Sequence, residues 1–272
     1  MTVQLIAHTP EPEKVVAAAA KLCYSDCHID NLLENLTDDK VNEFLNRLSG
    51  LGHASPTEHA VFTFAVEGVS RSLLAQITRH RIASFSVQSQ RYVRLGEKEG
   101  GSGFIMPKSI SDDANASEIY QQAVNHAMDM YKVLCRELES VHTAALMEQG
   151  LDKDEAKRKA SKMANEAARA VLPNACETRF IVTMNARELN AFFKLRCCNR
   201  AQDEIHALAD EMLKLVYPIA PHLFANAGPG CVCTGHCTEG SMSCGKQLEV
   251  KALYENMKKD LSAGKEQRHE IQ

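Results

Sequence analysis

The sequence predicts an α+β fold in which long helices cover a mostly antiparallel central sheet. Four short segments, rich in β-branched and aromatic residues, have the length and patterning of strands. Two longer stretches repeat apolar residues every three or four positions, which is the period of a helix that packs on one face. With 272 residues and 44% hydrophobic side chains, the chain can bury a sizeable core. The predicted strands are residues 2–8, 58–67, 86–95 and 177–184.

The N-terminal part predicts two helices between the first two strands. Residues 10–20 form a helix with a face of small side chains. Thr37, followed by two aspartates, caps a second, amphipathic helix that a Ser-Gly pair ends. Pro56 keeps the polar residues before the second strand out of helical geometry.

The central part contains the longest predicted helix, residues 117–149, which Gly150 ends. A shorter helix leads from Ser70 to Arg79, so that Gln76, Arg79 and His80 share one face. The glycine-rich residues 96–103 form a loop that lacks the Gly-Lys-Ser/Thr ending of a phosphate-binding loop.

The C-terminal part predicts three more helices and a tail. Asp152 and Glu155 form a capping box for a helix that runs to Pro173. Asn185 caps the next helix, and a further one ends before Pro218. The last twenty residues are charged and are expected to fray.

Composition limits the possible partners and compartment. A net charge of −4 and a pI near 6.3 disfavour a general nucleic-acid binder, which needs a broad basic surface. The N-terminus lacks the features of a secretory signal, and no apolar run reaches the length of a membrane span. We therefore expect a cytoplasmic protein with no nucleic-acid or membrane partner. Its ten cysteines are then expected to be reduced thiols or metal ligands.

Residues 76–92 concentrate the chemistry of the chain. Arg79, His80 and Arg81 are consecutive, and a Ser/Gln-rich turn separates them from Arg91. The guanidinium fork matches phosphate or carboxylate through two hydrogen bonds, and the amides can contact the edge of a base. This pattern favours a pocket for a small phosphorylated ligand, and a solvated basic turn is the alternative.

Residues 79–81, followed after seven residues by Ser89, form an RHR-x7-S pattern that resembles the signature of flavin-dependent thymidylate synthases. The pattern continues into Gln-Arg-Tyr at residues 90–92, as that family's motif often does. Residues 53–59, HASPTEH, are similar to the family's H-x-[ST]-P-x-E-H segment. The resemblance covers residues 15–216 and implies the fold of that family, with a catalytic domain at 1–222 and a Cys-rich extension at 223–272.

The resemblance also implies the activity. A member moves a methylene group from methylenetetrahydrofolate to dUMP and reduces it with a hydride from FAD, itself reduced by NADPH. The products are dTMP and tetrahydrofolate, and no cysteine acts as nucleophile. The family forms homotetramers with sites shared between subunits.

The resemblance assigns the substrate side of the site. Arg91 and Arg169 would hold the phosphate. Arg196 would stabilise negative charge on the uracil ring, Arg79 would contact the ring and Ser89 would orient the substrate, so these three are the catalytic candidates. The implied dUMP-binding set is Gln76, Arg79, Gln88, Ser89, Gln90, Arg91, Arg169 and Arg196.

The resemblance assigns the cofactor side as well, with His53 near the folate. Ala191 stands where members usually present an asparagine or histidine to the flavin, so a catalytically silent relative is one alternative. The implied FAD-binding set is Ser55, Glu58, Arg79, His80, Arg81, Ser86, Asn185, Arg187 and Leu195.

The Cys-rich tail raises the question of a metal. Thiolates at short spacing can bind zinc, but the tail lacks the paired C-x2-C pattern, so we expect free thiols and no metal. A nucleotide- or nucleic-acid-binding regulator with a zinc module is the alternative function. The zinc candidates in that case are Cys231, Cys233, Cys237 and Cys244.

Overall fold

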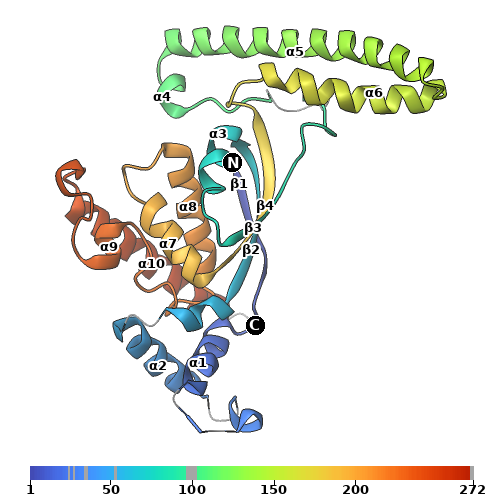
Figure 1. Cartoon of the computed structure of the whole chain (residues 1–272). Helices are drawn as coiled ribbons and strands as arrows, with labels where there is room; N and C mark the ends of the chain where they lie inside the picture. Colours follow the sequence, from blue (N-terminus) through green and yellow to red (C-terminus); the bar gives the residue numbers. More distant parts are fainter. Residues whose placement is uncertain (24, 27, 34–35, 52–53, 96–102, 270–272) are drawn as a thin grey trace. The chain divides into compact units, whose positions relative to one another are not determined.

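The structure is a computed structural model that describes residues 1–23, 25–26, 28–33, 36–51, 54–95 and 103–269 (Figure 1). The chain divides into two compact units. Unit 1 contains residues 1–66, 76–86 and 181–272, and unit 2 contains residues 67–75 and 87–180. The predicted boundary at residue 222 lies inside unit 1 and stays a prediction about which residues form the catalytic part.

The sheet has four antiparallel strands in the order β1-β2-β4-β3, which confirms the predicted fold class. Their side chains alternate between buried and accessible along β2 and β4, as a strand with one buried face requires. A backbone bond from Gln88 N to Arg179 O extends the pairing just beyond β3. The bounds are β1 Thr2–His8, β2 Val61–Ser70, β3 Ala83–Val87 and β4 Glu177–Asn185.

Two predicted strands have the wrong boundaries: β2 covers residues 61–70 and not 58–67, and β3 covers residues 83–87 and not 86–95. The third strand was expected over residues 86–95, but β3 ends at Val87 because the chain then enters the turn of residues 90–92. The second was expected to begin at residue 58, but Ser55–His59 form the 3₁₀ helix η2 and β2 begins at Val61. Pro56 fits the first turn of this short helix, because that position needs no N–H donor.

Unit 1 is built around aromatic side chains. Phe62, Phe192, Phe193 and Phe224 are fully buried. Their rings meet edge to face, with centroids 5.5 to 6.0 Å apart. Helix α8 packs on β1, and α7 packs on α8 (Figure 1). The helices of unit 1 are α1 Pro12–Leu22, η1 Ile29–Asn31, α2 Asp38–Leu51, η2, α7 Ala186–Arg196, α8 Asp203–Val216, α9 Gly230–Thr234, η4 Gly240–Met242 and α10 Gln247–His269.

Helix α10 shows that the expected fraying of the tail is wrong up to residue 269, and residues 270–272 lie outside the described part of the chain. Tyr254 is buried, and its hydroxyl lies 2.5 Å from Asp210 Oδ1 and 3.2 Å from Cys197 O. Lys258 donates from Nζ to the carbonyl oxygens of Ala225 and Ala227, and burial lowers the pKa of its ammonium group to about 8. These tertiary contacts hold a helix whose own sequence is largely polar.

Unit 2 contains a long helical hairpin. Helices α5 (Ala114–Glu148) and α6 (Lys153–Ala168) lie side by side (Figure 1). Helix α6 buries alanines at four-residue intervals, at positions 156, 160, 164 and 168, and such small side chains permit close helix packing. The core of this unit adds Phe104, Val124, Met128, Tyr131, Cys135 and Cys176. The shorter helices are α4 Lys108–Ser111 and η3 Arg169–Val171.

The caps of the hairpin follow the sequence in part. Asp152 Oδ1 accepts from the backbone N–H groups of Asp154 and Glu155 at 3.0 Å, as an N-cap should. The reciprocal half of the predicted capping box is absent, because the Glu155 carboxylate pairs with Lys159 at 2.8 Å. Helix α6 also ends before the predicted Pro173, since the residues ahead of a proline disfavour helical geometry.

No helix in the described part of the chain is long and apolar enough to cross a membrane.

We predict that Asp113→Ala lowers the free energy of unfolding by about 1 kcal/mol, the usual effect of losing an N-cap. Asp113 caps α5 by accepting from Ala116 N at 2.7 Å. Chemical denaturation of the variant measures the loss. Asp112→Ala, at the exposed neighbouring position, is the matched control, and an equal loss in both variants would contradict the assignment.

Candidate functional site

The segment after α3 (Arg71–Ile77) begins the candidate site in unit 1. Arg79 N donates to Gln76 O at 3.4 Å and His80 N donates to Ile77 O at 3.0 Å, so the chain tightens into a turn with i→i+3 bonds. The predicted helix to Arg79, with Gln76, Arg79 and His80 on one helical face, is therefore wrong. Arg79 is exposed after the turn, whereas His80 is buried.

His80 lies between Glu188 and Arg196, which are both on α7 and more than 100 residues away from His80 in sequence. Arg196 Nε donates to His80 Nε2 at 3.3 Å, and His80 Nδ1 lies 3.2 Å from Glu188 Oε1. Because a guanidinium cannot accept, Nε2 must be the unprotonated nitrogen, and Nδ1–H donates to Glu188. The imidazole is thus neutral and orients Arg196.

The electrostatics agree with a neutral His80. Burial lowers the pKa of His80, the hydrogen bond that its ring donates to Glu188 opposes that shift, and the charge of Arg196 adds to the lowering. Burial also lowers the pKa of Arg196, with a further contribution from the like charge of Arg79. Two guanidinium groups therefore interact in unit 1, and such a site favours an anionic or electron-rich ligand.

Gln76 completes this group. Its carbonyl oxygen accepts from Arg196 Nη2 at 3.4 Å, and its side-chain amide donates to Gln202 Oε1 at 3.3 Å. The predicted residues Gln76, His80 and Arg196 are therefore brought together, although 116 and 120 residues separate the bonded pairs in sequence.

The other predicted flavin residues of unit 1 fall into three sets. Asn185 caps α7 by accepting from Glu188 N at 2.8 Å, so it supports the helix that carries Glu188 and Arg196. Arg187 Nη1 and Glu58 Oε1 form an accessible ion pair at 2.5 Å. The remaining candidates are exposed: Ser55, Arg81, Ser86 and Leu195.

This donor set is compatible with a flavin dinucleotide. Arg81 and Arg187 are accessible cations in unit 1, as an anionic pyrophosphate requires. The predicted folate residue, His53, lies outside the described residues, so its role stays a prediction.

The predicted phosphate residues belong to unit 2. Ser89 O accepts from Tyr92 N and Val93 N, and Ser89 Oγ accepts from Arg91 N at 3.2 Å, which folds residues 89–93 into a turn. Arg91 Nε lies 2.8 Å from Glu166 Oε2. Arg169 follows Glu166 by three residues, at the start of η3. Gln88 lies one residue before the turn, where its backbone pairs with Arg179.

Two donors of this turn lack hydrogen bonds. Within the described part of the chain, Gln90 Nε2 and Arg91 Nε are buried side-chain nitrogens without a hydrogen-bond partner. Arg91 Nε is close to Glu166, but the pair does not have hydrogen-bond geometry. Buried unsatisfied donors are costly and uncommon. These two are therefore suited to the oxygens of an anionic ligand.

The four cysteines named for the alternative zinc site do not all lie together in the structure. A cavity of about 20 Å³, the size of one water, is lined by Cys198, Cys231, Cys237 and Cys244. Cys233 instead donates from Sγ to Gly228 O at 3.0 Å. Among the described residues, no group of three or more His, Cys, Asp or Glu is placed to hold a metal ion.

Comparisons with known proteins identify the family. Residues 4–222 match the model of the family described as thymidylate synthase complementing protein. The chain belongs to this family. The flavin-dependent thymidylate synthase of Clostridium tetani is 50% identical over 252 residues, which cover 93% of this chain and 96% of the relative. That of Geobacter sulfurreducens is 47% identical over 259 residues, covering 94% and 99%.

A solved structure supports the fold. The crystal structure of the flavin-dependent thymidylate synthase ThyX from Helicobacter pylori, complexed with FAD and dUMP, matches with a TM-score of 0.59. The match covers 84% of this chain and all of the Helicobacter pylori chain, at 23% sequence identity. The resemblance predicted from residues 53–92 is thus confirmed at the level of the family.

The sequence missed several residues that shape this site. The sequence indicates a helix cap at Asn185 but no role in the site for Glu188, whose backbone N–H donates to that cap and whose carboxylate contacts His80. Glu166, next to Arg91, was not singled out. No local signal marks either glutamate, because each partner lies far away in the chain.

We predict that Glu188→Gln lowers the pKa of His80 further, since the hydrogen bond and the charge of Glu188 both raise it. A lowered pKa in the folded state means that stability is lost as the pH falls below about 6.5, where the unfolded histidine gains its proton. In the variant, the loss of stability should begin at the same pH as in the unmodified protein, because the unfolded histidine is unchanged. It should continue to a lower pH, because the folded-state pKa of His80 is lower.

Histidine-ring NMR titration measures the effect. His206, whose pKa Asp210 raises through a hydrogen bond, is the internal control and should not change. A His80 pKa that rises in the variant would contradict the contact.

Proposed function

We propose that this chain is a flavin-dependent thymidylate synthase that converts dUMP to dTMP. Methylenetetrahydrofolate would supply the one-carbon group and NADPH the reducing equivalents. Bound FAD would supply the hydride chemistry, and the protein would supply position and charge. The observation that carries the proposal is the hydrogen-bonded group of Gln76, His80 and Arg196, in a chain whose residues 4–222 match the family.

Arg196 would act on the uracil ring. His80 and the carbonyl of Gln76 accept two of its donors, so the direction of the guanidinium is fixed. Partial burial strengthens its electrostatic effect on negative charge that develops on the ring. Arg79 would contact the same ring and add positive charge.

The phosphate would be held by the turn of unit 2. Among the described residues, Gln90 Nε2 and Arg91 Nε make no hydrogen bond, and Arg91 Nε is paired only electrostatically with Glu166. Arg169 would add a second cation. Gln88 would contribute to the same substrate-binding segment. The Ser89 hydroxyl already accepts from Arg91 N, so its proton is available for a substrate oxygen, and we assign it to orienting the substrate.

The cofactor would be held in unit 1 by accessible polar groups. Arg81 and Arg187 would bind the pyrophosphate. His80 would support the site through its contact with Glu188, and Asn185 would do so by capping the helix that carries Glu188. The remaining contacts would come from Ser55, Glu58, Arg79, Ser86 and Leu195, with His53 near the folate.

The quaternary state and location are part of the proposal. We propose a cytoplasmic homotetramer whose sites are shared between subunits, as the family resemblance implies. Sedimentation at working concentration tests the assembly, and a monomer alone would contradict it.

The visible absorption spectrum of the purified protein tests the function. We expect an oxidised-flavin spectrum that bleaches when NADPH and dUMP are added without oxygen, followed by dTMP formation when methylenetetrahydrofolate is supplied. A protein that stays colourless in the presence of FAD would overturn the proposal.

We predict that Arg196→Gln lowers kcat by about 10²- to 10³-fold, the typical effect of losing one donor that stabilises developing negative charge. Single-turnover dTMP formation measures the change, and the flavin spectrum should be retained. Lys194→Gln, which removes the same charge from an exposed position on α7, is the control. Equal losses in both variants would contradict a specific role for Arg196.

A further inference from the structure

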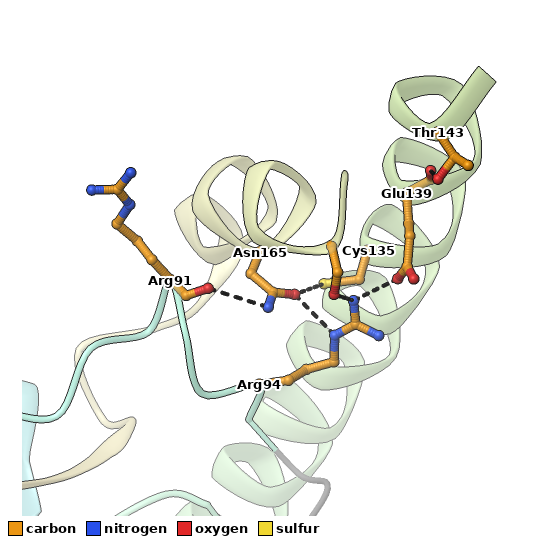
Figure 2. Close-up of polar contacts among 7 residues, drawn as sticks. Arg91, Arg94, Cys135, Glu139, Thr143 and Asn165 are labelled. Atoms are coloured by element: carbon orange, nitrogen blue, oxygen red, sulfur yellow. Dashed lines mark hydrogen bonds and ion pairs between the residues drawn. The ribbon is translucent and has the colours of Figure 1, made fainter. Parts of the chain in front are cut away.

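A polar network lies between the two helices of the hairpin and the turn that carries Arg91 (Figure 2). Arg94 Nη2 lies 2.7 Å from Glu139 Oε2 of α5 and 3.2 Å from Ser161 Oγ of α6. Arg94 Nε donates to Asn165 Oδ1 at 2.9 Å. Every member of this network belongs to unit 2.

Asn165 connects the network to the turn. It is 4% exposed, and its Oδ1 accepts from Arg94 Nε and from Cys135 Sγ, the latter at 3.6 Å. Two donors therefore fix the orientation of the amide, and its Nδ2 donates to Arg91 O at 3.4 Å. The backbone of Arg91 is thus tied to a buried side chain whose own rotamer is held by Arg94.

Arg91 is contacted at both ends by neighbouring residues of α6. Its carbonyl faces Asn165, while Figure 2 shows its guanidinium directed away from the network. That guanidinium lies near the carboxylate of Glu166, the residue after Asn165. The backbone anchor therefore sets the origin and direction of the side chain, and the side chain itself remains accessible, at 40% exposure.

The chemistry of the network favours positioning over simple packing. A partly buried Arg–Glu pair contributes little net stability, and apolar residues of similar size would join two helices at least as well. Hydrogen bonds differ from apolar contacts in being directional, and here they end on one carbonyl of the turn.

We infer that Arg94 and Asn165 are positioning residues that hold Arg91 for the phosphate of the nucleotide and so set the preference for dUMP over the nucleoside deoxyuridine. This inference rests on the proposed function, in which Arg91 contacts that phosphate. Glu139 and Ser161 act one step further away, by holding Arg94.

The decisive variant is Asn165→Asp. It keeps an acceptor for Arg94 and nearly the same volume, but it replaces the donor to Arg91 O with a carboxylate oxygen. Equilibrium binding of dUMP and deoxyuridine to the flavin-loaded enzyme measures the effect. We expect dUMP to bind about tenfold more weakly, the usual effect of losing one such hydrogen bond, and deoxyuridine to bind as before. KM for dUMP should rise by a similar factor, with kcat nearly unchanged.

A second variant tests the same inference if Asn165→Asp does not fold. Arg94→Met keeps the aliphatic stem and removes the charge, and Glu139→Gln in the same chain avoids an unpaired carboxylate. This double variant should show the same selective loss for dUMP. Lys159→Ala, which breaks the exposed ion pair with Glu155 on α6, is the matched control and should change neither ligand.

The outcomes distinguish a failure of the positioning inference from a failure of the proposed phosphate site. Equal weakening of dUMP and deoxyuridine by Asn165→Asp would mean a structural role and would overturn the inference. So would unchanged dUMP binding in Asn165→Asp when Arg91→Ala weakens it. If Arg91→Ala leaves dUMP affinity unchanged, the proposed phosphate site itself is wrong.

Discussion

The contact between His80 and Arg196 is the interaction on which the candidate site depends. Removing a charged guanidinium from water is costly, and the cost is offset only where acceptors are fixed nearby. A neutral imidazole supplies one acceptor without adding a second positive charge. Burial favours this neutral form, and the hydrogen bond to Glu188 selects the tautomer with the proton on Nδ1. One buried histidine thus holds a charged arginine and fixes the direction of its guanidinium. Helix α7 has to carry both Glu188 and Arg196 to make this possible.

In unit 2 a second arginine, Arg91, is also held by hydrogen bonds to fixed groups, but through its backbone carbonyl and not through its guanidinium. The alanine-lined face of α6 brings it close to α5, and the space left between these helices and the turn is filled by Arg94 and Asn165. Directional bonds then fix the turn of residues 89–93 while the guanidinium of Arg91 remains accessible. Rigid support behind an accessible cation lowers the ordering cost of binding an anion.

The C-terminal segment contributes scaffold. Tyr254 and Lys258 of α10 bond to carbonyl and carboxylate oxygens of unit 1. Burial raises the pKa of the Cys197 thiol, which makes this thiol a poor nucleophile. The thiols of Cys198, Cys231, Cys237 and Cys244 surround a cavity of about 20 Å³ in the same unit. Cys198 follows α7 and joins three cysteines of the tail at this cavity, a grouping that only tertiary packing produces.

The sequence by itself determined the fold class, three of the four strand segments to within a few residues, the caps at Asp152 and Asn185, and the family, because periodicity, capping and the RHR-x7-S spacing are local properties of the chain. It did not determine where the third strand ends, that the tail is helical, or that Glu188, Asn165 and Glu166 support the arginines. Those features arise from pairs such as His80 and Arg196, 116 residues apart, which only tertiary packing brings together. Local pattern fixes what a residue can do, and the contacts of the folded chain decide which partner it meets.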